Sequence, residues 1–276
     1  MMRINVLTDW GKAFVDQDGN FYCGTTEKQK DNAVRIIQDA DEVVNLADVH
    51  ARASAEFMAN GGMYPAHNLV KKDWHNLEDI GVPPDKNVDP NLTDKLYDMV
   101  KDRKAGLIVP RHVFFQNYDG ENRPDPVFRF EDVEETFGIG RLKPQEYMDG
   151  GIDYIVNAKH MFNGAAMQGY DFLGHVPGVP DIEMNYFTLL KQKYGQGKVL
   201  EFDFTGVVMG ICVYQGASGV KQLFPKAKVN VIADAVTHLA VPELGIPDEK
   251  VGDDVARRMC QQVGINYMTT KEYLGR

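Results

Sequence analysis

The stretch Gly197-Lys-Val-Leu-Glu-Phe-Asp-Phe-Thr-Gly206-Val-Val-Met-Gly-Ile-Cys212-Val213 joins an apolar run typical of a buried strand to a segment with helical spacing. We predict a strand over 197–204 and a helix over 211–223, which places Cys212 at the turn between them. The start of a helix favours a thiolate, because its backbone N–H groups carry partial positive charge. A lone cysteine is more often a small apolar core residue, so other segments must decide between these interpretations.

Two other polar side chains follow predicted strands in the same way. Asp9 ends the run over 4–8, and Lys159 follows the apolar residues that begin at Tyr154. Because the carboxyl ends of parallel strands meet at one edge of a sheet, we expect these residues and Cys212 to converge if the strands are parallel. Taken alone, Asp9 is equally a turn or helix-capping carboxylate, and Lys159 a surface lysine.

Strand-like and helix-like segments alternate along the chain, which predicts a three-layer α/β/α fold with a mostly parallel, Rossmann-like central sheet. The 276 residues suffice for a single domain over 1–276. The further predicted strands cover 42–47, 151–156 and 228–233, and the further predicted helices cover 26–40, 92–102 and 248–263.

The bulk properties exclude several classes of function. A formal net charge of −10 argues against a nucleic-acid surface. We find no apolar run near the roughly 20 residues of a membrane helix, and no apolar core of a signal peptide in the first residues. The cysteines Cys23, Cys212 and Cys260 are widely spaced and odd in number, which does not suggest a disulfide framework. We therefore expect a cytoplasmic protein without a membrane or nucleic-acid partner.

Several motifs, each weak alone, occur together in an order that resembles the isochorismatase-like cysteine hydrolases, and within them the nicotinamidases. The resemblance covers about 1–70 and 150–276. The stretches that carry it are Leu7-Thr-Asp9-Trp-Gly-Lys-Ala-Phe14, Asp48-Val-His50, Tyr64-Pro-Ala-His67, Lys159, the turn over 206–213, Val229-Asn-Val-Ile-Ala-Asp234-Ala and Gly264-Ile-Asn-Tyr-Met-Thr-Thr-Lys-Glu-Tyr.

The resemblance implies a role for each member of the trio. Cys212 would attack a carboxamide carbonyl, Asp9 would take the thiol proton and deliver it to the departing ammonia, and Lys159 would hold Asp9 and stabilise the thiolate. An amide is a poor electrophile with a poor leaving group, so its hydrolysis needs a strong nucleophile and an acid for the nitrogen.

The family also stabilises the oxyanion with two backbone N–H groups, one of which follows a cis peptide bond. In this chain they would belong to Val208 and Cys212, with the cis bond between Val207 and Val208. Met209 and Gly210 stand where the family usually has Thr and Asp. This departure leaves the nucleophile intact but leaves the hydrogen bonds around it undefined.

A divalent metal ion is the cofactor that the resemblance implies. Asp48 and His50 point to one face of an extended segment, and His67 lies behind an aromatic-proline pair. An isolated D-x-H is common and indicates little by itself. Glu56 matches one version of a fourth ligand position that varies in the family. This oxygen and imidazole set suits Zn²⁺, which we expect, as well as Fe²⁺ or Mn²⁺.

In nicotinamidases the pyridine nitrogen binds the metal, and Phe14 and Tyr64 match positions that flank the ring, although both could be core residues. We expect hydrolysis of nicotinamide to nicotinate and ammonia in NAD salvage, with a small carboxamide as the partner molecule and a homo-oligomer as the assembly. One alternative is another small-amide hydrolase of the superfamily, such as a carbamoyl or pyrazinamide-type amidase. The other is a non-catalytic metal-binding scaffold of the same fold.

Residues 71–150 fall outside the resemblance, because the chain from His67 to Lys159 is longer than in the family. Several prolines interrupt this range, in which we predict strands over 107–115 and 126–130 around a hairpin near 118–124. We interpret it as an inserted excursion from the sheet, either a wall or lid of the pocket or a subunit contact.

Seven side chains that could carry chemistry match no family position. We interpret them as surface or structural residues. They are His75, His112, His160, His175, His238, Cys23 and Cys260.

Overall fold

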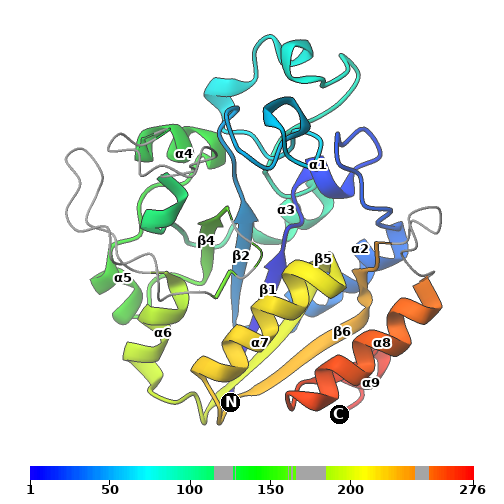
Figure 1. Ribbon diagram of the computed structural model, residues 1–276. Helices are drawn as coiled ribbons and strands as arrows, with labels where there is room; N and C mark the ends of the chain where they lie inside the picture. The colour runs from blue at the N-terminus through cyan, green and yellow to red at the C-terminus, as the bar shows by residue number, and fades with distance from the viewer. Residues whose placement is uncertain (115–126, 128, 161, 163, 166–184, 240–248) are drawn as a thin grey trace.

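A parallel sheet forms the centre of the computed structural model, which describes residues 1–114, 127, 129–160, 162, 164–165, 185–239 and 249–276 (Figure 1). Within these residues the sheet has seven strands in the order β3-β4-β2-β1-β5-β6-β7, and each pair of neighbours is parallel. The predicted α/β fold with a parallel sheet is confirmed. The strands are β1 (Met2–Thr8), β2 (Glu42–Asp48), β3 (Ala105–Ile108), β4 (Tyr154–Lys159), β5 (Leu200–Val207), β6 (Lys228–Thr237) and β7 (Asn266–Met268).

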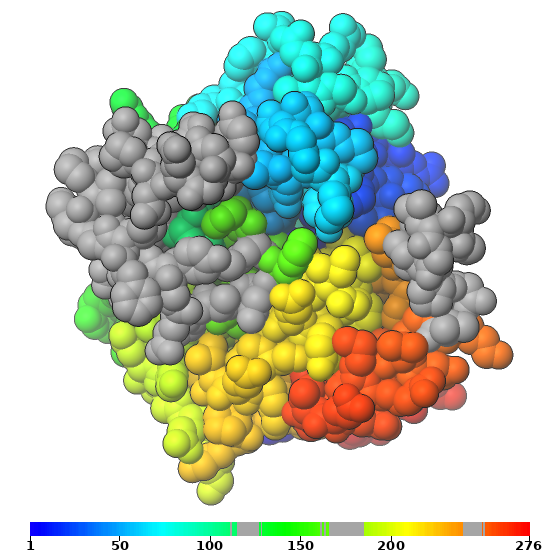
Figure 2. All heavy atoms as spheres, viewed as in Figure 1, coloured from blue at the N-terminus to red at the C-terminus, as the bar shows by residue number. Residues whose placement is uncertain are grey.

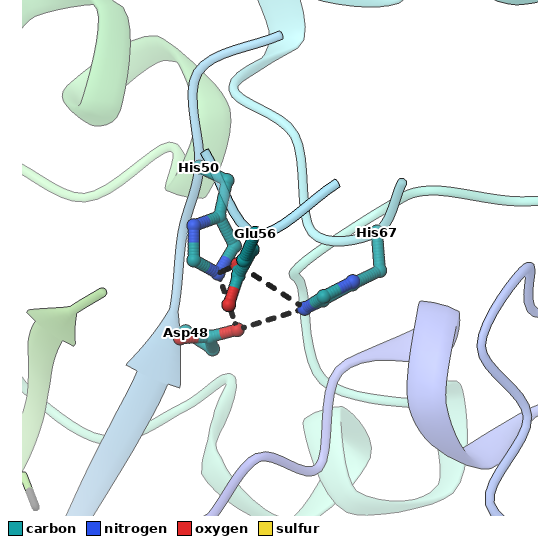
Figure 3. A group of neighbouring side chains, drawn as sticks. All are labelled: Asp48, His50, Glu56 and His67. Atoms are coloured by element: carbon teal, nitrogen blue, oxygen red, sulfur yellow. Dashed lines mark hydrogen bonds and ion pairs between the residues drawn. The ribbon is translucent and has the colours of Figure 1, made fainter. Parts of the chain in front are cut away.

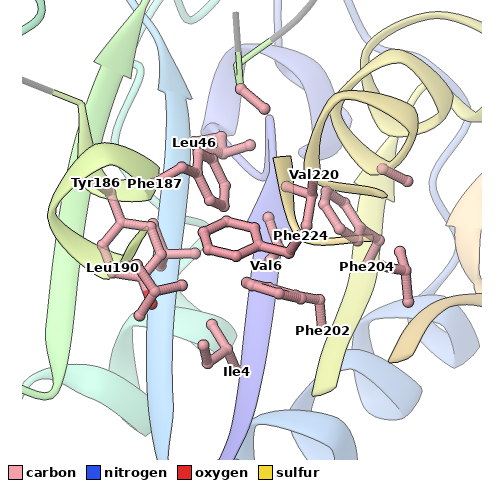
Figure 4. Packing of buried hydrophobic residues seen from close by; sticks show 14 of the residues in the cluster. Ile4, Val6, Leu46, Tyr186, Phe187, Leu190, Phe202, Phe204, Val220 and Phe224 are labelled. Carbon is pink, nitrogen blue, oxygen red and sulfur yellow. The ribbon is translucent and has the colours of Figure 1, made fainter. Parts of the chain in front are cut away.

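Helices cover both faces of the sheet and complete the three layers. On one face, α6, α7 and α8 pack on a cluster of aromatic and aliphatic side chains that includes Phe202 and Phe224 (Figure 4). On the other face, α2, α3 and α4 pack on a second cluster that includes Leu7 and Val43. The described helices are α1 (Lys12–Val15), α2 (Glu27–Gln38), α3 (Asp94–Val100), α4 (Phe130–Phe137), α5 (Pro144–Met148), α6 (Tyr186–Tyr194), α7 (Tyr214–Leu223), α8 (Glu249–Gln262) and α9 (Thr270–Leu274).

The central strands are buried because helices cover both of their faces. Every residue of β2 and β5 is buried. Thr26 caps the start of helix α2, and its side chain accepts a hydrogen bond from the backbone N–H of Gln29 in a capping box. Among the described residues, no helix is both long enough and apolar enough to cross a membrane.

Two predicted strands are displaced by three residues, and both displacements matter for the site. Strand β5 begins at Leu200 rather than at Gly197, because Gly197 adopts a left-handed conformation and its carbonyl accepts the Leu200 N–H in a turn. Strand β4 covers 154–159 rather than 151–156. Lys159 is therefore the last residue of a strand, and its position is fixed by the sheet.

The range 71–150 does not lie wholly outside the sheet, since β3 pairs with β4 at the sheet edge. The prediction of a strand over 107–115 is wrong beyond Ile108: Pro110 interrupts the segment, and a 3₁₀ turn follows over Arg111–Phe114. Phe130 begins α4 instead of ending a strand. Val127 and Arg129 are described and belong to no strand. Residues 126 and 128 and the predicted hairpin near 118–124 lie outside the described residues.

Candidate active site

The residues with candidate chemistry lie where four strands end. Asp9 follows β1, Asp48 ends β2, Lys159 ends β4, and Cys212 lies shortly after β5. These are the carboxyl ends of neighbouring parallel strands, where ligands bind in open α/β sheets. A cavity of about 60 Å³ opens there, and all four side chains line it. Figure 2 shows the loop that follows β2, in light blue, next to the segment around α7, in yellow, on one face of the molecule.

Lys159 connects two carboxylates at the base of this cavity. Its Nζ lies 2.9 Å from Asp9 Oδ1 and 3.2 Å from Asp48 Oδ1, and all three side chains are buried. The backbone N–H of Asp48 also donates to Asp9 Oδ1, at 3.2 Å. Burial lowers the pKa of Lys159, but the two carboxylates outweigh this and raise it above its usual value. Lys159 therefore stays positively charged.

Cys212 lies in a helical turn, Met209–Val213, that leads into α7, and its side chain lines the same cavity as Asp9. Desolvation in the pocket raises the pKa of Cys212 well above its usual value, the charge of Asp9 raises it further, and Lys159 opposes both. The prediction of a thiolate stabilised by the helix start is therefore wrong for the resting protein. A nucleophilic role for Cys212 would therefore require a base.

Asp9 has the properties of that base. Burial raises its pKa to about 6, although the charge of Lys159 acts in the opposite direction. A general acid–base group works best when its pKa lies near the working pH, because it must both accept and release a proton. Asp9 lines the same cavity as Cys212, and its charge acts on the pKa of the thiol.

The peptide bond between Val207 and Val208 is cis, as predicted. The Val208 carbonyl accepts hydrogen bonds from the N–H groups of Ile211 (3.0 Å) and Val213 (3.3 Å), which fold the turn around the nucleophile. Met209 is fully buried in the core. The buried side chain of Met209 and these two backbone hydrogen bonds stabilise the turn around Gly210.

Three further side chains, His50, Glu56 and His67, converge with Asp48 (Figure 3), which also contacts Lys159. One ligand atom from each of Asp48, His50, Glu56 and His67 lies within 4.8 Å of the others. His50 Nε2 lies 2.7 Å from both Asp48 Oδ2 and Glu56 Oε1, and His67 Nε2 lies 3.4 Å from Asp48 Oδ2. The resemblance implied that these four residues bind one metal ion, and in the structure their ligand atoms lie close together.

The donor set fits a divalent cation. His67 Nδ1 donates to the Pro65 carbonyl at 2.7 Å, which leaves the lone pair on Nε2 facing the cluster. Glu56 Oε1 is buried and makes no hydrogen bond within the described residues despite its short distance to His50. Burial lowers the pKa of His50, but Asp48 and Glu56 outweigh it and raise the pKa to about 10. The centre of the cluster thus attracts positive charge.

Aromatic side chains form the outer part of the cavity. Phe14 and Tyr64 line it, as predicted, and so do Phe21 and Phe162, which the sequence did not single out. The Phe21 ring lies 5.5 Å from Phe14, 5.5 Å from Tyr64 and 5.0 Å from His67, measured between ring centroids. An apolar slot lined by these mutually tilted aromatic rings therefore lies next to the cation ligands, and it suits an apolar or aromatic group.

Two side chains interpreted from sequence as structural, Cys23 and His160, also line the cavity. Burial raises the pKa of Cys23 to about 12, and its thiol donates to the Phe21 carbonyl, so Cys23 is unreactive. His75 is exposed and Cys260 is buried in the core, as predicted, whereas His175 lies outside the described residues.

Comparison with known proteins identifies the architecture. No family model matches the sequence, and no curated protein sequence matches it. An isochorismatase-like hydrolase from Alkaliphilus metalliredigens superposes on 100% of this chain and 98% of its own, with a TM-score of 0.53 and 13% identity. The chain has the isochorismatase-like fold.

Nicotinamidases share this isochorismatase-like fold. The yeast nicotinamidase bound to the inhibitor nicotinaldehyde matches over 97% of this chain and all of its own, with a TM-score of 0.55 and 13% identity. The pyrazinamidase/nicotinamidase of Streptococcus mutans matches over 96% of this chain and 99% of its own, with a TM-score of 0.53 and 12% identity. At these identities the likeness establishes the fold alone.

We expect Lys159 to lower the pKa of the Cys212 thiol. Lys159→Met should lower amide hydrolysis by at least about 100-fold and slow alkylation of Cys212, because the thiol pKa rises when the cation is removed. The measurement is the iodoacetamide rate against pH in a Cys23→Ala, Cys260→Ala background. Lys95→Met, which removes a partly exposed surface ammonium, is the control. Equal rates for Lys159→Met and its parent at every pH would refute this role.

Proposed function

We propose that this protein is a metal-dependent cysteine amidohydrolase that converts nicotinamide to nicotinate and ammonia. The observation that carries the proposal is the position of Lys159 Nζ, 2.9 Å from Asp9 and 3.2 Å from Asp48. This contact joins a thiol–carboxylate pair to a group of cation ligands inside one cavity. The aromatic slot and the similarity in fold to nicotinamidases support the choice of substrate.

The first half of the reaction forms a thioester. Asp9 takes the proton from Cys212 as Sγ attacks the carboxamide carbon, and the carbonyl oxygen becomes an oxyanion. The backbone N–H groups of Val208 and Cys212 are the proposed donors to that oxyanion. Asp9 then gives its proton to the amide nitrogen, the C–N bond breaks, and ammonia leaves the acyl group on Sγ.

The second half releases the acid. Asp9, again a carboxylate, accepts a proton from a water molecule that attacks the thioester carbon. The C–S bond breaks, and the proton returns from Asp9 to Sγ. Lys159 remains charged throughout and keeps Asp9 oriented. The products are nicotinate and the free thiol enzyme.

Asp48, His50, Glu56 and His67 are the residues that would hold the divalent ion, for which we propose zinc, with iron or manganese as alternatives. A bound ion would supply a Lewis-acidic position for the pyridine nitrogen. Phe14, Phe21 and Tyr64 would hold the ring of the substrate in the outer part of the cavity. We place the reaction in cytoplasmic NAD salvage and propose a homo-oligomeric enzyme.

Benzamide, which lacks the ring nitrogen, should be a much poorer substrate than nicotinamide, with kcat/KM lower by about 100-fold. Pyrazinamide keeps the ring nitrogen and should be hydrolysed. Chelation should abolish this discrimination without unfolding the protein, because Asp48 ends β2 and the other three cation ligands lie in the segment that follows it. Ammonia release from the three amides, measured before and after chelation and after addition of Zn²⁺, tests the proposal.

The same assay separates the alternatives. Equal, metal-independent cleavage of nicotinamide and benzamide would replace the proposal with a generic small-amide hydrolase. Absence of turnover with any amide, together with an unreactive Cys212, would indicate a metal-binding scaffold.

A further inference from the structure

Asn68 follows the cation ligand His67 directly, and the proposed reaction gives it no role. It is buried, and its backbone φ of +47° lies in the left-handed region. Among residues with a side chain, asparagine adopts this conformation more readily than most. A residue held in such a conformation persists only where its surroundings fix it, so its contacts are informative.

Two contacts join Asn68 to cation ligands. Its backbone carbonyl accepts the N–H of His50 at 2.8 Å, and the His50 carbonyl accepts the N–H of Val70 at 3.0 Å. Its side-chain Nδ2 donates to Asp48 Oδ2 at 3.5 Å. An ionised carboxylate only accepts hydrogen bonds, so the nitrogen of the amide is the atom that must face it. Asn68 therefore contacts two of the cation ligands, and the residue before it is a third.

The two oxygens of Asp48 face different partners. Its Oδ1 lies 3.2 Å from Lys159 Nζ, and its Oδ2 lies 2.7 Å from His50 Nε2 and 3.4 Å from His67 Nε2 (Figure 3). The Asn68 amide thus meets the oxygen that belongs to the group of cation ligands. A donor at this oxygen opposes rotation of the carboxylate, and ligating carboxylates are commonly oriented by such hydrogen bonds.

The other atom of the amide lies against the loop after β1. Asn68 Oδ1 is buried and makes no hydrogen bond within the part of the chain that the structure describes. It lies so close to Gly11 that a Cβ added there would stand 3.1 Å from it. Turning the amide over would place two acceptors together at Asp48. The orientation with one unsatisfied oxygen is therefore the less costly of the two.

We propose that Asn68 is a positioning residue for the cation site. Its amide orients Asp48 Oδ2 toward the cation, and its backbone carbonyl holds His50 beside it. Asn68 is not one of the four residues that offer a ligand atom, so it acts through them. The inference rests on the metal dependence of the proposed function and adds a residue to it.

The first test measures zinc affinity in the absence of substrate. Asn68→Gly removes the amide but keeps a residue that accepts a positive φ. We expect its zinc dissociation constant, measured by competition with a chromophoric chelator, to rise about 10- to 100-fold. Excess Zn²⁺ should restore the zinc-dependent rise in Tm, because the site is weakened and not lost. Asn76→Gly is the matched control, since Asn76 is exposed and has a φ of +46°.

A second variant tests the donor without removing the side chain. Asn68→Asp keeps the size of the residue and its tolerance of a positive φ, but at neutral pH it presents only acceptors to Asp48. We expect the absorption spectrum of bound Co²⁺ to differ from that of the unmodified protein, because this spectrum depends on the geometry of the ligands. The Asn76→Gly protein should give the unmodified spectrum.

The outcomes separate this inference from the function on which it rests. A zinc dissociation constant within about threefold of the unmodified value in Asn68→Gly, or an unchanged Co²⁺ spectrum in Asn68→Asp, overturns the inference and leaves the function standing. Loss of zinc stabilisation that excess Zn²⁺ does not restore would show a role in folding and also overturn it. If the unmodified protein binds neither Zn²⁺ nor Co²⁺, both fail.

Discussion

Replacing Cys212 with alanine should abolish amide hydrolysis, with a loss in kcat of at least about 10⁴-fold, because no other nucleophile is available to form the thioester. Of the other cysteines, Cys23 lines the cavity with its thiol bonded to a carbonyl, and Cys260 is buried in the core. Both have a raised pKa of about 12. Ammonia release by the purified Cys212→Ala variant, at enzyme concentrations high enough to detect residual turnover, is the measurement.

Cys23→Ala and Cys260→Ala are the matched controls and should keep most of the activity. The Cys212→Ala protein should retain its fold and its metal content, since Cys212 is not a cation ligand. Turnover within about tenfold of the unmodified enzyme would show that another group attacks the amide, and the thioester route would have to be abandoned.

Replacing Asp9 with asparagine should change two measurements in opposite directions. Hydrolysis should fall by about 10²- to 10⁴-fold, because the proton can no longer leave the thiol or reach the amide nitrogen. Alkylation of Cys212 should become faster at neutral pH, because the negative charge of Asp9 raises the pKa of the thiol. Lys159 keeps Asp48 as a partner in the variant, so its ammonium stays paired.

Rates of ammonia release and of iodoacetamide labelling on the same preparation test both parts. Asp16→Asn is the control, since Asp16 pairs with Lys30 and does not line the cavity. If labelling and hydrolysis both fall, Asp9 acts by holding the turn in place and not by accepting a proton.

The position of the site could be predicted from the sequence because the order of the strands brings its residues together. Once Asp9, Lys159 and Cys212 are each placed at the end of a parallel strand, their convergence follows from topology. The four cation ligands were placed by resemblance, and their donor atoms do converge. These predictions required only that each residue be assigned to the correct strand or loop. Errors of three residues in the bounds of β4 and β5 therefore did not affect them.

Properties that depend on burial could not be predicted in this way. The helix start suggested a thiolate at Cys212, but desolvation has the larger effect and keeps the thiol protonated. Phe21 and His160 were missed because nothing in their spacing separates a cavity wall from a core or a surface. Strand β3 was misjudged because it is short, and the buried apolar residues Val113 and Phe114 of the turn after Pro110 resemble a continuation of the strand.

The central place of β1 has a consequence for how the protein is made. Strand β1 lies between β2 and β5, and its residues pair with β5 from Met2 to Thr8. During synthesis the apolar side chains of this first strand, such as Ile4 and Val6, remain without their β5 neighbours until about three quarters of the chain has left the ribosome. Parallel pairing of strands that are far apart in the sequence is slow, and unpaired strand edges are prone to aggregation until the pairing is complete. Because Asp9 and Cys212 come together only after this pairing, catalytic competence would appear only once β5 has joined β1.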